Sequence, residues 1–130
     1  MRDLEFKNID IIHFSMTAFL LEPGEEMKLE DAVFENFRIH GEGQKELIRL
    51  RPTINQYMRT KVPGHINNIA FKNISVEGKE GPYTIQLIGA DEEHNVSGIT
   101  LSGISILGKK IRKDSRNLLI DKYVYGLKMQ

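Results

Sequence analysis

The sequence predicts an all-β chain built from about four similar repeats, and three observations lead to this class. One eight-residue pattern occurs four times, a second short apolar segment follows each copy, and turn-forming residues separate the two. The copies begin at Leu4, Ala32, Ile69 and Ile99, so that successive copies start 28, 37 and 30 residues apart. Periods of roughly 20–50 residues are typical of repeat folds, in which neighbouring repeats bury a common core.

The pattern predicts two short strands joined by a bend. In the clearest copy, Ile69–Val76, apolar and polar residues alternate on each side of Asn73, as they do in a half-buried strand. The phase of this alternation shifts by one residue at Asn73. The chain must therefore bend there if the apolar side chains on both sides are to enter one core.

The residue at the bend is asparagine in three copies, at Asn8, Asn36 and Asn73, and glycine at Gly103 in the fourth. An asparagine amide can bond both the backbone of its own turn and the asparagine of the next repeat. We therefore predict a structural ladder of Asn8, Asn36 and Asn73 that satisfies buried polar groups, in preference to a ligand site. Gly103 indicates a bend with positive φ or the end of the ladder.

The second apolar segments complete the repeats. Stacked repeats of two or three short strands, with variable loops between them, predict a right-handed parallel β-helix of about four coils. A β-sandwich with coincidental spacing is the alternative, but it does not explain the same bend in every copy. The second segments are 18–21, 47–50, 84–88 and 118–120, and the coils span approximately 3–28, 29–64, 65–95 and 96–130, with a closing strand over 123–129.

Bulk composition limits the partners that we expect. The 130 residues carry a formal net charge of zero and no cysteine, so we predict no nucleic-acid partner and no disulfide framework. No apolar run approaches the roughly 18 residues of a membrane span, and we predict no membrane partner. The first copy follows Met1 directly. We therefore expect either further coils upstream or self-association through open β-helix ends.

A basic and aromatic group stands out near the longest insertion. In the strand predicted over Glu46–Arg51, Ile48 and Leu50 take the core phase, while Leu47 shares the opposite phase with Arg49. Guanidinium groups hold carboxylates, and tyrosine stacks on the apolar face of a sugar. The alternative is a solvated loop and strand face. The predicted substrate-binding residues are Arg49, Arg51, Tyr57, Arg59 and Lys61.

The sequence offers no clear catalytic group. Glycoside hydrolysis needs two carboxylates roughly 5–9.5 Å apart, yet the acidic segments at 25–26 and 91–93 have the composition of solvated turns. Four histidines occur singly, without a short metal-binding spacing. We therefore predict no catalytic residue, no metal ligand and no cofactor. The histidines are His13, His40, His65 and His94.

The repeated pattern, as it stands in Ile66–Val76, resembles the later coils of pectate-lyase-like β-helix proteins. It is most similar to polygalacturonase-type and dextranase-type glycoside hydrolases. In that family, clustered aspartates, a Gly-His-Gly segment and an Arg-Ile-Lys segment lie on successive coils. Arg49-Leu50-Arg51 takes a place similar to the last of these, whereas the aspartate and Gly-His-Gly segments are missing.

The resemblance implies the C-terminal β-helix portion of a polysaccharide-active glycoside hydrolase, from a secreted or periplasmic parent. Such a portion lacks the catalytic coils, is inactive by itself and contributes substrate-binding residues. Two alternatives remain open, because a fold does not determine a function. One is a noncatalytic carbohydrate-binding β-helix module, and the other is a structural or adhesin-type solenoid.

Overall fold

The computed structural model describes residues 2–54 and 61–130, and all regular structure in these ranges is β-strand. The prediction of an all-β chain is therefore confirmed. The described part holds no helix that could cross a membrane. The strands are β1 Leu4–Ile11, β2 Phe19–Leu21, β3 Lys28–Glu42, β4 Glu46–Leu50, β5 His65–Lys79, β6 Thr84–Leu87, β7 Val96–Ile106, β8 Lys109–Lys110, β9 Leu118–Ile120, β10 Val124–Tyr125 and β11 Lys128–Met129.

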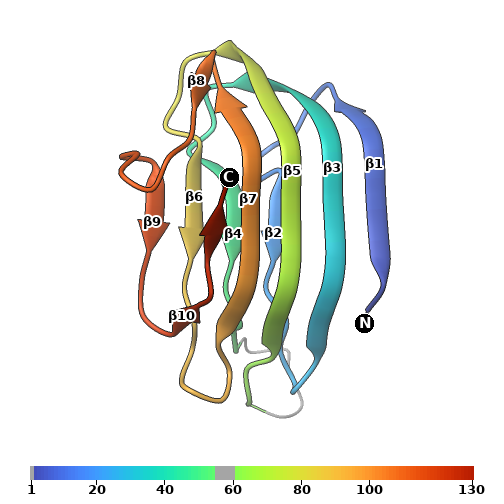
Figure 1. Cartoon of the computed structure of the whole chain (residues 1–130), viewed down its shortest axis with the longest axis vertical. Helices are drawn as coiled ribbons and strands as arrows, with labels where there is room; N and C mark the ends of the chain where they lie inside the picture. Colours follow the sequence, from blue (N-terminus) through green and yellow to red (C-terminus); the bar gives the residue numbers. More distant parts are fainter. Residues whose placement is uncertain (1, 55–60) are drawn as a thin grey trace.

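The strands form two separate sheets, and long and short strands alternate along the chain (Figure 1). The large sheet has the order β1-β3-β5-β7-β10, with β8 and β11 also paired to β7, and the small sheet has the order β2-β4-β6-β9. Among these strands every pair is parallel except β7 with β8. The long strands β1, β3, β5 and β7 run upward in Figure 1, and the strands of the small sheet run downward. The connections from the small sheet to β3, β5 and β7 therefore lie at the lower end.

The four copies of the repeat pattern pair with one another in register. Leu4 pairs with Ala32, Ala32 with Ile69, and Ile69 with Ile99. The spacing found in the sequence is therefore the spacing between paired strands. The C-terminal segment extends this order, because β10 and β11 both pair parallel to β7. The single closing strand predicted over 123–129 is two short strands, separated by Gly126 with φ 66°.

The bend in each copy has left-handed backbone geometry. Asn8, Asn36 and Asn73 have φ values of 58°, 59° and 54°, and Gly103 has 62°. Glycine adopts this region freely, and asparagine tolerates it better than most residues. Asn36 donates from Nδ2 to Asn8 Oδ1 at 2.9 Å, and Asn73 donates to Asn36 Oδ1 at 2.6 Å. These side chains are exposed, so the ladder runs along the surface. The prediction that it satisfies buried polar groups is therefore wrong.

A second column of bends, which the sequence analysis missed, precedes the first by five residues. Asp31 and Asn68 have φ values of 58° and 55°, and Gly98 has 65°. Asn68 donates from Nδ2 to Asp31 Oδ1 at 2.7 Å. The strands β3, β5 and β7 therefore bend twice, and each bend is occupied by Asp, Asn or Gly because these residues tolerate positive φ.

The core lies between the two sheets and contains a stack of phenylalanines. The rings of Phe6, Phe34 and Phe71 from three neighbouring long strands lie nearly parallel, with centroid separations of 5.2 and 5.0 Å. Phe19 from the small sheet meets Phe34 and Phe71 edge-on, each at 5.3 Å. Such edge-to-face contacts add to the free energy gained by burial. Phe19 therefore ties the small sheet to the large one.

The strand β4 contains an irregularity that changes which side chains are buried. Its register to β6 shifts between Glu46 and Ile48, so Leu47 is an extra residue in the ladder. Leu47 and Ile48 are both fully buried. The prediction that Leu47 shares the outward phase of Arg49 is therefore wrong, because a bulge interrupts the alternation between them.

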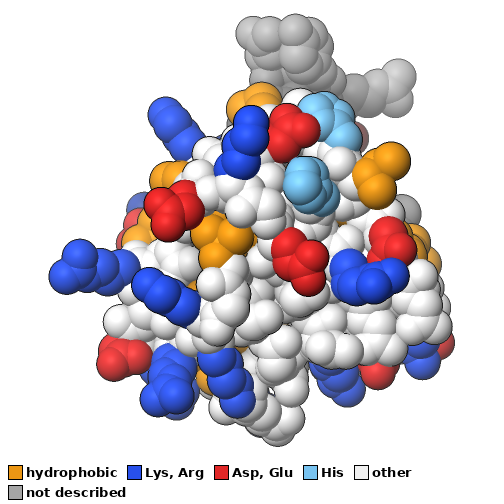
Figure 2. Space-filling model, turned by 90° about the horizontal axis from the view of Figure 1, so that it is seen from above, with side chains coloured by type: hydrophobic (Ala, Val, Ile, Leu, Met, Phe, Trp, Pro, Cys, Tyr) orange, Lys and Arg blue, Asp and Glu red, His pale blue; other side chains and the backbone are white. Residues whose placement is uncertain are grey.

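Figure 2 looks onto the upper end of the molecule, where the long strands β3, β5 and β7 terminate. Acidic and basic side chains are interspersed there, and hydrophobic side chains show as separate spots among them. This end carries mixed charge, and the polar clusters described below belong to the small sheet and to the opposite end.

Candidate functional site

Three connections run from short strands to long strands at the lower end, and they pack on one another. They span residues 22–27, 51–64 and 88–95. Thr53 and Gly64 donate from their backbone nitrogens to Pro23 O, each at 3.0 Å, and His65 N donates to Met27 O at 2.8 Å. Backbone pairing of this kind brings side chains from successive repeats together although they are far apart in sequence.

The two arginines predicted as binding residues share one carboxylate. Arg51 Nη2 lies 2.6 Å from Glu22 Oε2, and Arg51 Nε donates to the same oxygen at 2.9 Å. Arg49 Nη1 lies 4.0 Å from Glu22 Oε2, while its Nη2 lies 2.6 Å from Glu46 Oε2. We call Glu22, Glu46, Arg49 and Arg51 the arginine–glutamate cluster. Its formal charges cancel.

The other predicted residues are placed differently. Lys61 is exposed in the second connection. Tyr57 and Arg59 lie outside the residues that the structure describes. The structure thus joins Arg49 and Arg51 through Glu22, and the role predicted for the other three stays a prediction.

Sequence reasoning missed Glu22 and Glu46, although a signal for Glu22 was present. Arg51 N donates to Leu21 O, which places Glu22 opposite Arg51 just beyond the paired strands. An alignment of the second apolar segments, in addition to the main pattern, would have matched these two positions. Glu46 was found only through the structure, because the bulge at Leu47 lies between Glu46 and the alternating residues.

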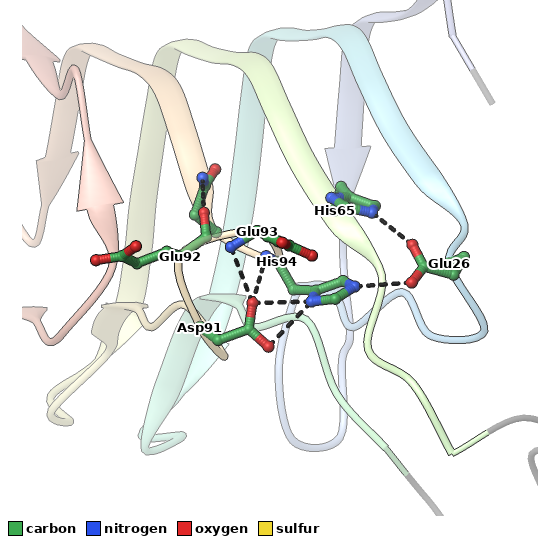
Figure 3. Close-up of polar contacts among 7 residues, drawn as sticks. Glu26, His65, Asp91, Glu92, Glu93 and His94 are labelled. Atoms are coloured by element: carbon green, nitrogen blue, oxygen red, sulfur yellow. Dashed lines mark hydrogen bonds and ion pairs between the residues drawn. The ribbon is translucent and has the colours of Figure 1, made fainter.

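A second polar cluster lies where the three connections meet (Figure 3). His65 Nε2 lies 2.8 Å from Glu26 Oε2, and His94 Nε2 lies 2.9 Å from Glu26 Oε1. The two imidazole rings are 4.7 Å apart between centroids. On the other side of His94, Nδ1 lies 2.8 and 3.0 Å from the oxygens of Asp91. We call Glu26, His65, His94 and Asp91 the histidine cluster.

Local backbone geometry positions each member of the histidine cluster. Glu26 follows Glu25 in a turn where both residues have positive φ, 61° and 51°. His65 is the first residue of β5 and pairs with Lys28 of β3. Asp91 accepts hydrogen bonds from the backbone nitrogens of Glu93 and His94 at 2.9 and 2.7 Å, which is the usual way that aspartate closes a tight turn.

The carboxylates change the acid–base properties of the cluster. The hydrogen bond to Glu26 raises the pKa of His94, Asp91 acts in the same direction, and partial burial opposes both. Hydrogen bonds from His94 and then from His65 lower the pKa of Glu26. The pKa of Asp91 is lowered chiefly by the backbone hydrogen bond from His94. Each carboxylate therefore favours its ionised form, and His94 favours the imidazolium.

The interpretation of the histidines as scattered single residues is wrong for His65 and His94. Register explains why: Ile66 pairs with Val96, so His65, one residue before Ile66, and His94, two residues before Val96, lie at the starts of neighbouring strands. Glu26, His65 and His94 each offer one possible ligand atom, a carboxylate oxygen or an imidazole nitrogen, and these three atoms lie within 4.8 Å of one another. These three residues could hold a metal ion, and an alignment of the segments preceding each repeat would have suggested the pairing.

Comparisons with protein-family models, with curated proteins and with solved structures give no match for this chain. The resemblance to polygalacturonase-type and dextranase-type hydrolases therefore depends on the repeat motif in the sequence.

Proposed function

We propose that the chain forms about four coils of a right-handed parallel β-helix and that the outer face of its small sheet binds a polysaccharide. By its resemblance to the later coils of polygalacturonase-type hydrolases, the chain contributes binding residues to a polysaccharide-active hydrolase and leaves the catalytic acids to other coils. It is inactive by itself.

The alternation of strands between two parallel sheets supports the β-helix. Each long strand returns to its own sheet through a short strand of the other sheet, which is the kind of crossover that parallel pairing requires. Crossovers between parallel strands of one sheet are right-handed in about 98% of cases. An experimental structure with left-handed crossovers, or with antiparallel pairing of the long strands, would contradict this part of the proposal.

The observation that carries the binding proposal is a row of side chains across the small sheet. Leu20, Arg49, Gln86 and Leu119 occupy neighbouring register positions on β2, β4, β6 and β9. Leu20 and Leu119 are 52% and 45% exposed. The row therefore combines a planar guanidinium and an amide with apolar side chains. Sugars offer hydroxyl groups and apolar C–H faces, which match these two kinds of contact.

The arginine–glutamate cluster favours a neutral sugar over an acidic one. The resemblance implies that Arg49 and Arg51 bind a sugar carboxylate or sugar hydroxyls. In the structure Glu22 and Glu46 already neutralise these guanidinium groups. A second carboxylate would have to compete with them, whereas a hydroxyl can accept from the remaining N–H groups, since each guanidinium has five N–H donors. The proposed ligand is therefore a neutral polysaccharide.

Binding of the purified chain to dextran and to polygalacturonate, measured by isothermal titration and affinity electrophoresis, tests this proposal. We expect binding to the neutral polymer, and we expect Arg49→Ala combined with Arg51→Ala to weaken it at least tenfold. Arg38→Ala is the matched control, because Arg38 also pairs with a carboxylate, Asp10 at 3.0 Å, but on the large sheet. Equal loss in the control, unchanged binding in the double variant, or a preference for polygalacturonate would overturn the proposed site or ligand.

A second candidate function is a structural solenoid that stacks end to end. Strand β1 lies at the edge of the large sheet, and Phe6 is 41% exposed with one ring face against Phe34. An edge strand with exposed apolar side chains can pair with another chain. Concentration-dependent association in sedimentation, reduced by Phe6→Lys and accompanied by no affinity for any glycan, would favour this candidate over carbohydrate binding.

A further inference from the structure

We propose that Glu26, His65 and His94 form a binding site for a divalent first-row transition-metal ion, and that Zn²⁺ fits it well. The site goes beyond carbohydrate binding and uses residues of the histidine cluster only. Its donor atoms are two imidazole nitrogens and one carboxylate oxygen, all within 4.8 Å of one another.

The donors converge on one point between the three connections (Figure 3). Both Nε2 atoms face the Glu26 carboxylate, at 2.8 and 2.9 Å from its two oxygens. Zinc binds imidazole nitrogen and carboxylate oxygen at about 2.0–2.2 Å. An ion between the two rings therefore requires the carboxylate to move aside, and the Glu26 side chain, which is 57% exposed, has room to do so.

Asp91 supports His94 as a metal ligand. It accepts from Nδ1 of His94, so that once a metal ion displaces the proton from Nε2, the lone pair of that atom points toward the cluster centre. Backbone N–H groups of Glu93 and His94 hold the Asp91 carboxylate in place. Metal-binding histidines commonly donate their second ring nitrogen to a carboxylate in this way, which orients the ring and strengthens the ligand. An arrangement built from an isolated ion pair would lack this support.

The chemistry of the donors selects the class of ion. Imidazole suits zinc, copper, iron and nickel, whereas Ca²⁺ and Mg²⁺ take oxygen ligands. Three protein ligands leave at least one coordination position open. Two ligands come from the connections that lead into β3 and β7 and one from the first residue of β5, with sequence separations of 39 residues between Glu26 and His65 and 68 between Glu26 and His94. A bound ion therefore ties together the segments at the starts of β3, β5 and β7.

Titration of the purified, chelator-treated chain with Zn²⁺ tests the site, and Co²⁺ serves as a spectroscopic probe. We expect one ion per chain, with Co²⁺ absorption bands typical of low coordination number. His65→Gln and His94→Gln should each weaken binding at least a hundredfold. His13→Gln is the matched control, because His13 also lies near a glutamate, 3.5 Å from Glu42, but has no second histidine in the described contacts.

Asp91→Asn tests the supporting carboxylate. We expect Zn²⁺ affinity to fall about 10–100-fold, while the stoichiometry stays at one ion per chain. Circular dichroism and urea unfolding without metal show whether each variant still folds. If His94→Gln does not fold, Glu26→Gln provides another variant that lacks a ligand. Absence of stoichiometric Zn²⁺ binding, or equal binding by the wild type and folded ligand variants, would overturn the proposal. Arg49→Ala combined with Arg51→Ala should retain full Zn²⁺ affinity, so the two proposals fail independently.

Discussion

Glu26 bridges His65 and His94 by placing one carboxylate oxygen against each imidazole, at 2.8 and 2.9 Å. Glu26 and His94 lie in the connections that lead into β3 and β7, and His65 is the first residue of β5. The Glu26 carboxylate brings these segments into one polar cluster. This relationship depends on the register of the large sheet, because the pairing of β3 with β5 and of β5 with β7 aligns the starts of these strands.

Metal removal should lower the stability of the chain. Because Zn²⁺ needs the folded arrangement of Glu26, His65 and His94, a concentration 100-fold above its Kd should add about 2.7 kcal/mol to the free energy of unfolding. Urea unfolding before and after treatment with EDTA measures this difference. His65→Gln should show little response to Zn²⁺. Equal stabilisation of that variant would place the ion elsewhere.

The pH dependence of His94 can be followed in the metal-free chain. The Glu26 and Asp91 carboxylates raise its pKa above the ordinary value, which is about 6.5 for histidine. A group that binds its proton more tightly when folded stabilises the fold fully below its unfolded pKa. That contribution is lost as pH rises through the folded pKa. Nuclear magnetic resonance titration of the His94 ring should give a pKa above the ordinary value, and a lower one would contradict the hydrogen-bond network.

The left-handed bends should make Asn36 sensitive to substitution despite its exposure. Asn36→Ala keeps a β-carbon at φ 59° but loses the polar side chain that makes this region tolerable, and it removes two hydrogen bonds of the ladder. It should therefore cost about 2 kcal/mol. Asn36→Gly relieves the backbone and should cost about 1 kcal/mol. Lys72→Ala, also exposed on the large sheet, should change stability by less than about 0.5 kcal/mol. Urea unfolding measures all three. If the glycine variant were less stable than the alanine variant, backbone geometry would not be the main cause.

The contact between the two sheets should depend strongly on Phe19. Its ring is 5% exposed and meets Phe34, Phe37 and Phe71 edge-on. Phe19→Ala should cost about 3–5 kcal/mol in the free energy of unfolding. Phe19→Leu leaves a smaller cavity and should be less destabilising, which keeps the test usable if the alanine variant does not fold.

Leu20→Ala provides the control for Phe19, because Leu20 follows it in β2 but is 52% exposed. This substitution should change stability by less than about 0.5 kcal/mol. A similar loss for both variants would mean that β2 is stabilised by its strand pairing and not by insertion of Phe19 into the core.

Strand pairing could be predicted from the sequence because its causes are local and repeated. Alternation of apolar residues marks the strands, and Asn or Gly marks the left-handed bend in each copy. The spacing between Leu4, Ala32 and Ile69 is also the register of the sheet. These features depend only on the conformational preferences of single residues and on the burial of apolar side chains in one common core.

Tertiary structure alone decided the polar sites. The bulge at Leu47 depends on how β4 pairs with β6, and the neutralisation of Arg51 depends on Glu22 from the preceding repeat. The contact between the His65 and His94 rings depends on connections of unequal length that lead into β5 and β7 at adjacent register positions. Repetition therefore encodes the stacked strands in the sequence, whereas contacts between irregular connections arise only when the strands are in register.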